Sequence, residues 1–333
     1  MDMTAQTGTI RVQRWTLTSR TAVALFTLLL VVLAFGPVFL GPTGLISLTR
    51  LFTYVIIAVM WNALAGYGGL ISIGQQGFFG LGAYAAIRLA NAGIAPYPAL
   101  FLGALGVGVL SIPISTFILR LKEGQFAIGT WVLAELMMLV ITLDPIINGD
   151  TGTSMLQLTN IAPGVRLPTN YWIAFGSMVV LLVVMFLFLR GRIGAGIQAI
   201  RDDEGAAASV GVRVFYTQQI LFVLAALAAA MGGALWVAQT ITFQPPSFFN
   251  VQWSAYMIFM VLVGGIGTFE GAIIGAIIFF IVEHFLGSSG VWYLIALGAV
   301  SVLFALFLPK GIWGVVEERF GINLLPVGYR IRR

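Results

Sequence analysis

Long apolar segments follow one another along the chain, and charged residues, Gly/Pro clusters or polar loops separate them. A helix needs about 20 apolar residues to cross the hydrocarbon core of a bilayer. Unbroken apolar runs of this length also lack the residue-by-residue alternation of a barrel strand. The pattern therefore predicts an all-α polytopic membrane protein with about ten transmembrane helices. The ten expected segments are 22–40, 47–66, 70–88, 97–119, 125–143, 171–189, 215–240, 253–267, 270–286 and 291–309.

The least regular part of this pattern is 253–286, where two short apolar pieces flank a glycine-rich turn at 264–271. Two separate spans would account for it. A single span followed by a re-entrant hairpin would account for it equally well, provided that the irregular backbone is buried in protein.

Basic residues indicate how the helices are oriented. Fourteen of the 17 Lys and Arg residues fall on one side of the expected membrane, and only Arg50, Arg88 and Arg166 fall on the other. Cytoplasmic loops carry the excess of positive charge, so both termini are expected in the cytoplasm. The expected organisation is a cytoplasmic segment at 1–20, a transmembrane domain at 21–310 and a cytoplasmic tail at 311–333. Within the domain, 144–170 forms an external loop and 190–215 a cytoplasmic one.

Composition excludes several classes of protein. Of the 333 residues, 59% are hydrophobic and 9% are charged, whereas about 25% are charged in a soluble domain. The absence of cysteine excludes disulfides and thiolate sites, and one histidine gives no expected metal site. Basic residues are scattered, so no nucleic acid is expected as a partner. Neither Lys122 nor Lys310 lies in a phosphate-binding Gly-x-x-x-x-Gly-Lys-Ser/Thr loop, which argues against an enzyme that hydrolyses ATP.

Glycines and polar side chains interrupt the apolar run at 66–84, and a second glycine-rich break lies at 264–275. Lipid cannot satisfy the freed backbone groups, so each break must face protein or a wet cavity. Paired breaks of this kind indicate a translocation path, but in the second break Gly267, Gly271 and Gly275 form a small face that favours helix packing instead. The expected helix-breaking glycines are Gly66, Gly69, Gly74, Gly77, Gly265 and Gly267. The expected path residues are Ser72, Gln75, Gln76, Phe78, Tyr84 and Glu135.

Glu135 stands near the middle of a predicted span. A carboxylate in the hydrocarbon core costs a few kcal/mol unless it is protonated or paired. It is therefore either part of a transport path or a buried structural partner of another polar group. As a titrating group it would also suit a proton-coupled secondary transporter, which is the alternative to transport driven by a separate ATPase.

The inner loop contains a stretch that is too polar and too short to cross the membrane. It can form an amphipathic helix of two or three turns at the cytoplasmic surface. Such a rigid helix could serve as a lever for a moving partner. The residues expected in it are Arg201, Asp202, Asp203, Glu204, Ala206, Ala207 and Gly211.

Several stretches, in order along the chain from about residue 49 to 314, resemble one known family. They are Gly-Tyr-Gly-Gly at 66–69 with Ser-x-Gly-Gln at 72–75 and Phe-Phe-Gly-x-Gly-Ala-Tyr at 78–84, Ala-Ile-Arg-Asp-Asp-Glu at 199–204, Gly-Gly-Ile-Gly at 264–267 and Leu-Pro-Lys-Gly at 308–311. Together they resemble the branched-chain amino acid ABC transporter permeases, specifically the M-type subunit of the leucine/isoleucine/valine system.

The resemblance implies a permease in a bacterial inner membrane. Its implied partners are a second permease, two cytoplasmic ATPase subunits that bind ATP and magnesium, and an extracytoplasmic binding protein, while the chain itself holds no cofactor. The stretch around 204–211 would be the coupling helix that enters a cleft on the ATPase. Ala195 and Gln198 stand where the family usually has basic residues. The outer loop follows the family pattern loosely, so urea, short amides and aromatic acids stay open as alternative substrates.

Overall fold

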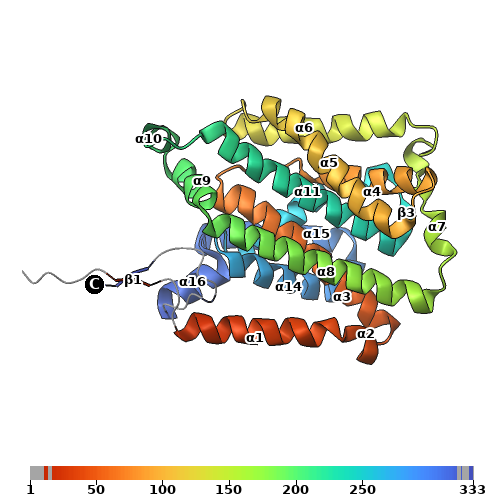
Figure 1. Ribbon diagram of the computed structural model, residues 1–333, viewed down its shortest axis with the longest axis horizontal. Helices are drawn as coiled ribbons and strands as arrows, with labels where there is room; N and C mark the ends of the chain where they lie inside the picture. The colour runs from red at the N-terminus through yellow and green to blue at the C-terminus, as the bar shows by residue number, and fades with distance from the viewer. Residues whose placement is uncertain (1–10, 14–16, 321–323, 325–329, 333) are drawn as a thin grey trace, which may run out of the picture.

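Long apolar helices run side by side along the long axis of the protein (Figure 1). The computed structural model describes residues 11–13, 17–320, 324 and 330–332. The predicted terminal segments 1–20 and 311–333 therefore lie partly outside the described residues. The long helices are α1 (Leu17–Ala34), α3 (Pro42–Asn62), α4 (Gln75–Asn91), α5 (Pro96–Ile118), α6 (Glu123–Thr142), α8 (Pro163–Arg190), α11 (Val214–Thr240), α13 (Gln252–Gly264), α14 (Phe269–Leu286) and α15 (Val291–Phe307).

Short elements connect and cap these helices. The short helices are α2 (Gly36–Phe39), α7 (Leu156–Thr159), α9 (Arg192–Asp202), α10 (Glu204–Ser209), α12 (Pro245–Phe248) and α16 (Gly311–Phe320), with a π-helical turn η1 (Ala63–Tyr67) and 3₁₀ turns η2 (Gly149–Thr151) and η3 (Gly287–Ser289). The strands form two antiparallel pairs, β1 (Arg11–Gln13) with β4 (Arg330–Arg332) and β2 (Thr153–Ser154) with β3 (Thr242–Phe243).

The predicted fold class is confirmed. Among the described residues, eight helical segments are long and apolar enough to cross a membrane, and α1 adds a shorter apolar helix. The 17-residue α4 lies where the third span was expected and packs against α11, α5 and α6. The region 253–286 forms two such helical segments, Pro245–Gly264 and Phe269–Leu286, that pack against each other. This favours two spans over a re-entrant hairpin.

Several predicted boundaries differ from the structure: α1 and α3 each begin five residues before the expected positions 22 and 47, and three further differences have a local cause. The third segment was expected to begin at residue 70, but α4 begins only at Gln75, because 68–74 is irregular. The outer loop was expected to end at 170, but α8 begins at Pro163, whose fixed φ and missing N–H suit the first turn of a helix. The cytoplasmic lever was expected as one helix, but Asp203 has an extended backbone and separates α9 from α10.

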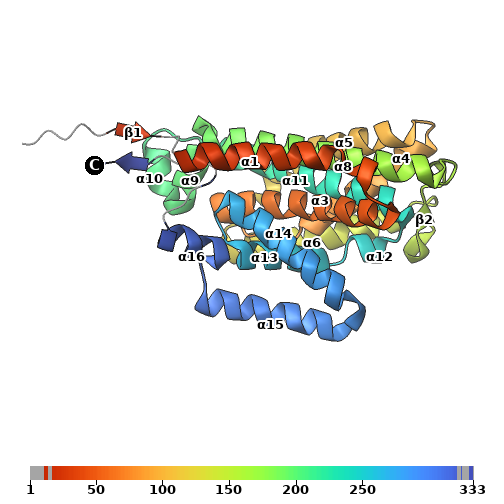
Figure 2. The same ribbon diagram turned by 90° about the horizontal axis from the view of Figure 1, so that it is seen from below.

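The core of the protein lies around α11, which contacts α4, α5 and α3. Small residues allow this close approach: a Cβ added to Gly82 would lie 2.0 Å from the carbonyl oxygen of Ala230 on α11. In contrast, Figure 2 shows α15 set apart from the other helices. In the membrane-spanning segment Val291–Phe320, which contains α15, only 11% of the 18-residue apolar stretch is buried within the chain. Apolar side chains on α15 are suited to face lipid or another subunit.

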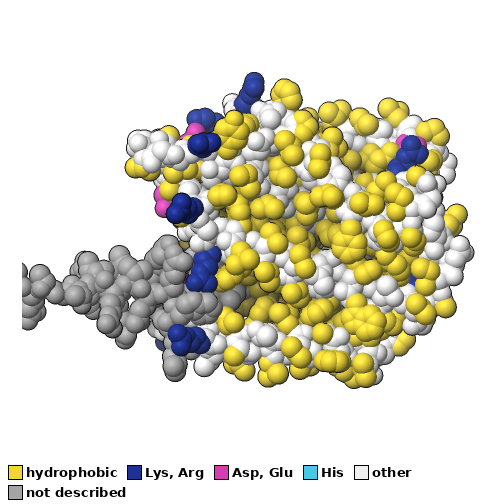
Figure 3. Space-filling model, viewed as in Figure 1, with side chains coloured by type: hydrophobic (Ala, Val, Ile, Leu, Met, Phe, Trp, Pro, Cys, Tyr) yellow, Lys and Arg dark blue, Asp and Glu magenta, His cyan; other side chains and the backbone are white. Residues whose placement is uncertain are grey.

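The two ends of the bundle differ in charge. The helices α9, α10 and α16 lie at one end, here called the α9 end, and α2, α7 and β3 lie at the opposite α7 end (Figure 1). On the face shown in Figure 3, Lys and Arg side chains gather mainly over the α9 end. This is the distribution that the positive-inside rule associates with a cytoplasmic surface.

Candidate functional site

The break between α3 and α4 is built from irregular backbone whose polar groups are paired inside the protein. The chain leaves the π-helical turn η1 through Gly69, whose φ of +68° favours glycine. Trp61 Nε1 then donates a hydrogen bond of 2.9 Å to the carbonyl oxygen of Ser72. The backbone N–H of Ile73 donates to Thr130 Oγ1 at 3.2 Å. The break is therefore held by side chains of α3 and α6, as the lipid environment requires.

Two neighbouring amides at the start of α4 are buried with incomplete hydrogen bonding. Gln75 Nε2 donates to Ser72 Oγ at 3.4 Å, and Gln76 Oε1 accepts from Ser254 Oγ on α13. The other amide atoms, Gln75 Oε1 and Gln76 Nε2, are buried and have no hydrogen-bond partner among the described residues. Leaving a buried polar atom unpaired costs about 1–3 kcal/mol. These two atoms therefore have unused hydrogen-bonding capacity in this arrangement of the helices.

The structure does not bring all the expected path residues together. Phe78 is 1% exposed and packs against Phe222 of α11 with ring centroids 5.5 Å apart. Tyr84 lies further along α4, where its hydroxyl donates a hydrogen bond to Asp144. Glu135 accepts a hydrogen bond of 3.3 Å from Trp131 on its own helix, among exposed apolar side chains of α6. Only Ser72, Gln75 and Gln76 form a common cluster.

The expected helix-breaking glycines serve close packing. A Cβ on Gly74 would lie 2.0 Å from the carbonyl oxygen of Thr130, and one on Gly77 would lie 2.9 Å from Ala134 Cα, both on α6. In the second break, a Cβ on Gly264 would lie 1.9 Å from the carbonyl oxygen of Gly271. The packing interpretation of that break is thus supported, because α13 and α14 approach through glycine.

The two glycine-rich breaks contact each other at the α9 end. A Cβ on Gly66 would lie 2.4 Å from the backbone nitrogen of Gly267. Asn62 joins them: its Nδ2 donates to the carbonyl oxygen of Thr268 at 2.8 Å, and its Oδ1 accepts from the Gly267 N–H at 2.8 Å. Sequence reasoning missed Asn62, although a carboxamide inside an otherwise apolar run was a usable signal.

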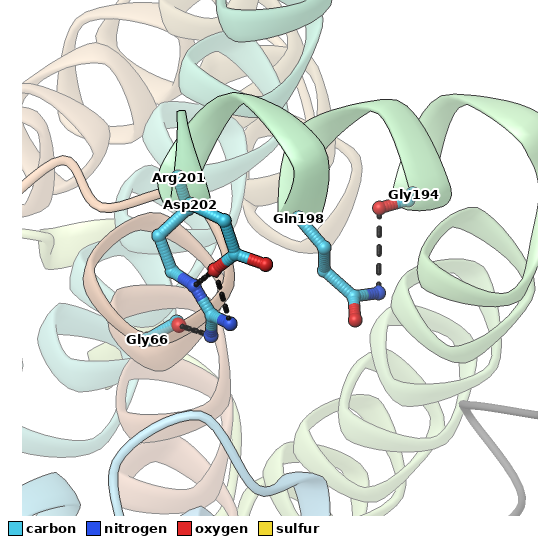
Figure 4. A network of polar contacts seen from close by, with 5 residues as sticks. All are labelled: Gly66, Gly194, Gln198, Arg201 and Asp202. Carbon is cyan, nitrogen blue, oxygen red and sulfur yellow. Dashed lines mark hydrogen bonds and ion pairs between the residues drawn. The ribbon is translucent and has the colours of Figure 1, made fainter. Parts of the chain in front are cut away.

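Arg201, expected in the coupling segment, reaches the same joint from α9 (Figure 4). Its Nη1 donates a hydrogen bond of 2.8 Å to the carbonyl oxygen of Gly66, and its Nη2 forms an ion pair of 2.9 Å with Asp202. Its side chain also lies over Gly69, where a Cβ would come within 3.1 Å of Arg201 Cγ. The segment from α9 is thereby attached to η1 at the end of α3, and through Asn62 to the turn before α14. We call Asn62, Gly66, Gly267 and Arg201 the joint.

The remaining coupling residues lie on α10 and around it. Asp203 caps this helix by accepting a hydrogen bond of 2.9 Å from the Ala206 N–H. Glu204 lies 3.7 Å from Lys122 in the turn between α5 and α6. Ala207 is 2% exposed, and Gly211 follows the helix with a φ of +90°. The segment therefore contains a short helix whose N-terminus is capped and which lies close to the turn before α6.

A second polar cluster connects the loop after α6 to α4. Asp144 Oδ2 accepts a hydrogen bond of 2.7 Å from the Tyr84 hydroxyl and lies 3.2 Å from Arg88 Nε. The Tyr84 hydrogen bond, a hydrogen bond from the Ile146 N–H and the positive charge of Arg88 together lower the pKa of the Asp144 carboxyl from its ordinary value of 3.8. The charged form is thus favoured in the folded state.

Asp144→Asn should lower the thermal midpoint of the purified protein at pH 7 by roughly 2–4 °C, which corresponds to about 1 kcal/mol. The folded-state pKa is depressed, so the carboxylate stabilises the fold at pH above 3.8, and this contribution is lost as the pH falls through the lower folded value. The midpoints of variant and wild type should therefore converge in strong acid. Asp150→Asn, at an exposed position, is the control. A difference that is independent of pH would contradict this account.

The sequence is similar to known membrane permeases. Residues 44–308 match the family described as branched-chain amino acid transport system / permease component. The high-affinity branched-chain amino acid transport system permease protein LivM of Escherichia coli (strain K12) is 25% identical over 86% of this chain and 74% of its own length. A probable LivM of Methanocaldococcus jannaschii is 23% identical over 85% of this chain and 86% of its own. The ribose import permease protein RbsC of Escherichia coli (strain K12) is 25% identical over 92% and 99%.

Proposed function

The chain belongs to the family of branched-chain amino acid transport permeases, and from this premise we propose that it is the M-type permease subunit of an ATP-driven importer for branched-chain or related small amino acids. In this proposal it works in the inner membrane with both termini in the cytoplasm. Its partners are a second permease, two ATPase subunits that bind ATP and magnesium, and an extracytoplasmic binding protein.

The observation that carries the proposal is the bond between Arg201 and Gly66. A partner that moves α10 would move α9, and through Arg201 it would pull on the end of α3. The bond ends on a π-helical turn, and such turns are frequent at functional sites. Asn62 extends the connection to the turn before α14. A push from the cytoplasm thereby reaches both glycine-rich breaks.

A movement of the helices would change the surroundings of the two buried amides, Gln75 and Gln76. Separation of α4 from α13 would expose Gln76, whose bond to Ser254 connects these helices in the closed arrangement. Gln75 and Gln76 would then offer unpaired hydrogen-bonding groups to a solute. We propose that Ser72, Gln75 and Gln76 line the path in its open state, and that the present structure represents its closed state.

The LivM relatives support branched-chain amino acids as the substrate, while the similarity to RbsC calls for a direct comparison with a sugar. The test is uptake of radiolabelled L-leucine and D-ribose into liposomes that contain the chain assembled with the second permease and ATPases encoded beside it, with binding protein outside and ATP inside. ATP-dependent accumulation of leucine is expected. If ribose, urea or an aromatic acid accumulated instead, that solute would be the substrate and the proposed amino acid substrate would be wrong. Uptake driven by a pH step through this chain alone would indicate a secondary transporter that uses Glu135.

Arg201→Gln should reduce ATP-driven uptake by roughly 5- to 150-fold, the range of a 1–3 kcal/mol coupling free energy. The variant loses the charge-assisted bond to Gly66, whereas ATP hydrolysis by the partner subunits should continue. Arg213→Gln removes an equal charge from an exposed position on the same end and should transport normally. If both variants were equally impaired, loss of positive charge would be the cause, and the joint would have no role in coupling.

A further inference from the structure

A cavity of about 240 Å³ lies beside α12, toward the α7 end of the bundle (Figure 2). It lies between α3, α11, α13 and α14, and its mouth is formed by exposed residues after α12. It is smaller than the ~300–1,000 Å³ pockets that hold drug-sized ligands. The residues that line it are Tyr54, Trp236, Ser247, Asn250, Gln252, Trp253, Tyr256 and Glu283.

Aromatic rings form the walls of this cavity and support one another. The ring centroids of Tyr54 and Trp236 lie 5.8 Å apart, those of Trp236 and Trp253 4.8 Å, and those of Trp253 and Tyr256 5.9 Å. The indole of Trp253 is further fixed by a hydrogen bond of 3.0 Å from Nε1 to the carbonyl oxygen of Ser247. Such walls offer apolar surface to a hydrocarbon side chain and negative ring faces to a cation.

Glu283 is the charged residue in the lining. Its Oε1 accepts a hydrogen bond of 2.8 Å from the Tyr54 hydroxyl, which fixes the carboxylate against the aromatic wall. Its side chain is 19% exposed, so the group is largely withdrawn from water. A carboxylate in this setting attracts an ammonium group more strongly than one in bulk water would.

Arg50 lies beside the Glu283 carboxylate but forms only a long ion pair with it. Arg50 Nη1 lies 3.9 Å from Glu283 Oε1, which is long for an ion pair, and the guanidinium lies over Trp236 at 5.5 Å. Arg50 Nε is buried and has no hydrogen-bond partner among the described residues. Arg50 is not one of the lining residues, but its side chain is 41% exposed and lies next to Glu283, so we infer that its guanidinium can reach an anionic group bound beside that carboxylate.

We propose that this cavity is a binding site for a small apolar α-amino acid in its zwitterionic form. Glu283 receives the ammonium group, Arg50 receives the carboxylate, and the aromatic walls formed by Tyr54, Trp236, Trp253 and Tyr256 receive the side chain. The proposal rests on the proposed function and adds to it a substrate-binding site that is separate from the joint.

The test measures equilibrium binding of radiolabelled L-leucine to the assembled permease–ATPase complex in nanodiscs, without the binding protein. Leucine is expected to bind. On the wild-type complex, 4-methylpentanoate, which lacks the ammonium group, and 3-methylbutylamine, which lacks the carboxylate, should each compete at least ten-fold more weakly. Equal competition by either analogue, preferred binding of D-ribose, or no binding of leucine would overturn the site.

Glu283→Gln should weaken leucine binding at least ten-fold, whereas Glu318→Gln, which removes a carboxylate paired with Lys310 at the α9 end, should bind as wild type does. The analogue series needs no variant, so it decides the matter if Glu283→Gln does not fold. If Glu283→Gln binds leucine as tightly as wild type and ATP-driven leucine import is still observed, the proposed site is wrong and the proposed function stands. If leucine binding depends on Glu283 but no ATP-driven import is observed, the site is supported and the proposed function is wrong.

Discussion

Gly74→Ala should abolish uptake and lower the stability of the purified protein. The added Cβ would lie 2.0 Å from the carbonyl oxygen of Thr130 and 2.3 Å from its carbonyl carbon. Both are backbone atoms, so no side-chain rotation can relieve the clash, and α4 must move away from α6. Overpacking of this kind costs typically 1–3 kcal/mol. It also displaces Gln75 and Gln76, which follow directly.

Uptake and thermal unfolding should be measured together for this variant. Gly106→Ala on α5 is the matched control, because a Cβ there meets no atom within 4 Å. Gly74→Leu should be at least as damaging as Gly74→Ala. Wild-type uptake by Gly74→Ala would show that the contact between α4 and α6 is not needed for transport.

Ala207→Pro should uncouple ATP hydrolysis from uptake while leaving membrane insertion intact. Proline inside a helix costs about 3 kcal/mol. Here it would remove the hydrogen bond of 3.0 Å from the Ala207 N–H to the carbonyl oxygen of Asp203, on a residue that is 2% exposed. The helix α10 has only six residues, so with its interior interrupted it should no longer transmit a push. The long apolar helices are unaffected.

The measurement is uptake per ATP hydrolysed by the reconstituted transporter, and a fall of at least about ten-fold is expected, near 1.4 kcal/mol of coupling. Ala208→Ser changes an exposed residue of the same helix and keeps its backbone N–H, so it should remain coupled. If Ala207→Pro imported leucine at the wild-type ratio, α10 would not be the lever.

The sequence by itself determined the class of the protein and the order of its helices. The length of an apolar run decides whether a segment can cross a membrane, and that property is local. A polar stretch at 190–215 between two apolar runs likewise had to lie at a membrane surface. The boundaries at Gln75, Pro163 and Asp203 were predicted less well, because a glycine-rich segment, a proline or an aspartate can either continue an element or end it. The neighbours that pack against the residue decide which occurs.

Only the tertiary structure decided which polar residues meet. Asn62 and Gly267, Arg201 and Gly66, and Tyr54 and Glu283 are separated by 205, 135 and 229 positions along the chain. It also placed Glu135 beside Trp131, among exposed apolar side chains of α6. In a soluble helix the polar face would have indicated which side is buried. In a membrane the faces toward lipid and toward protein are both apolar, so the pattern identifies the helices, and only their packing shows which faces meet.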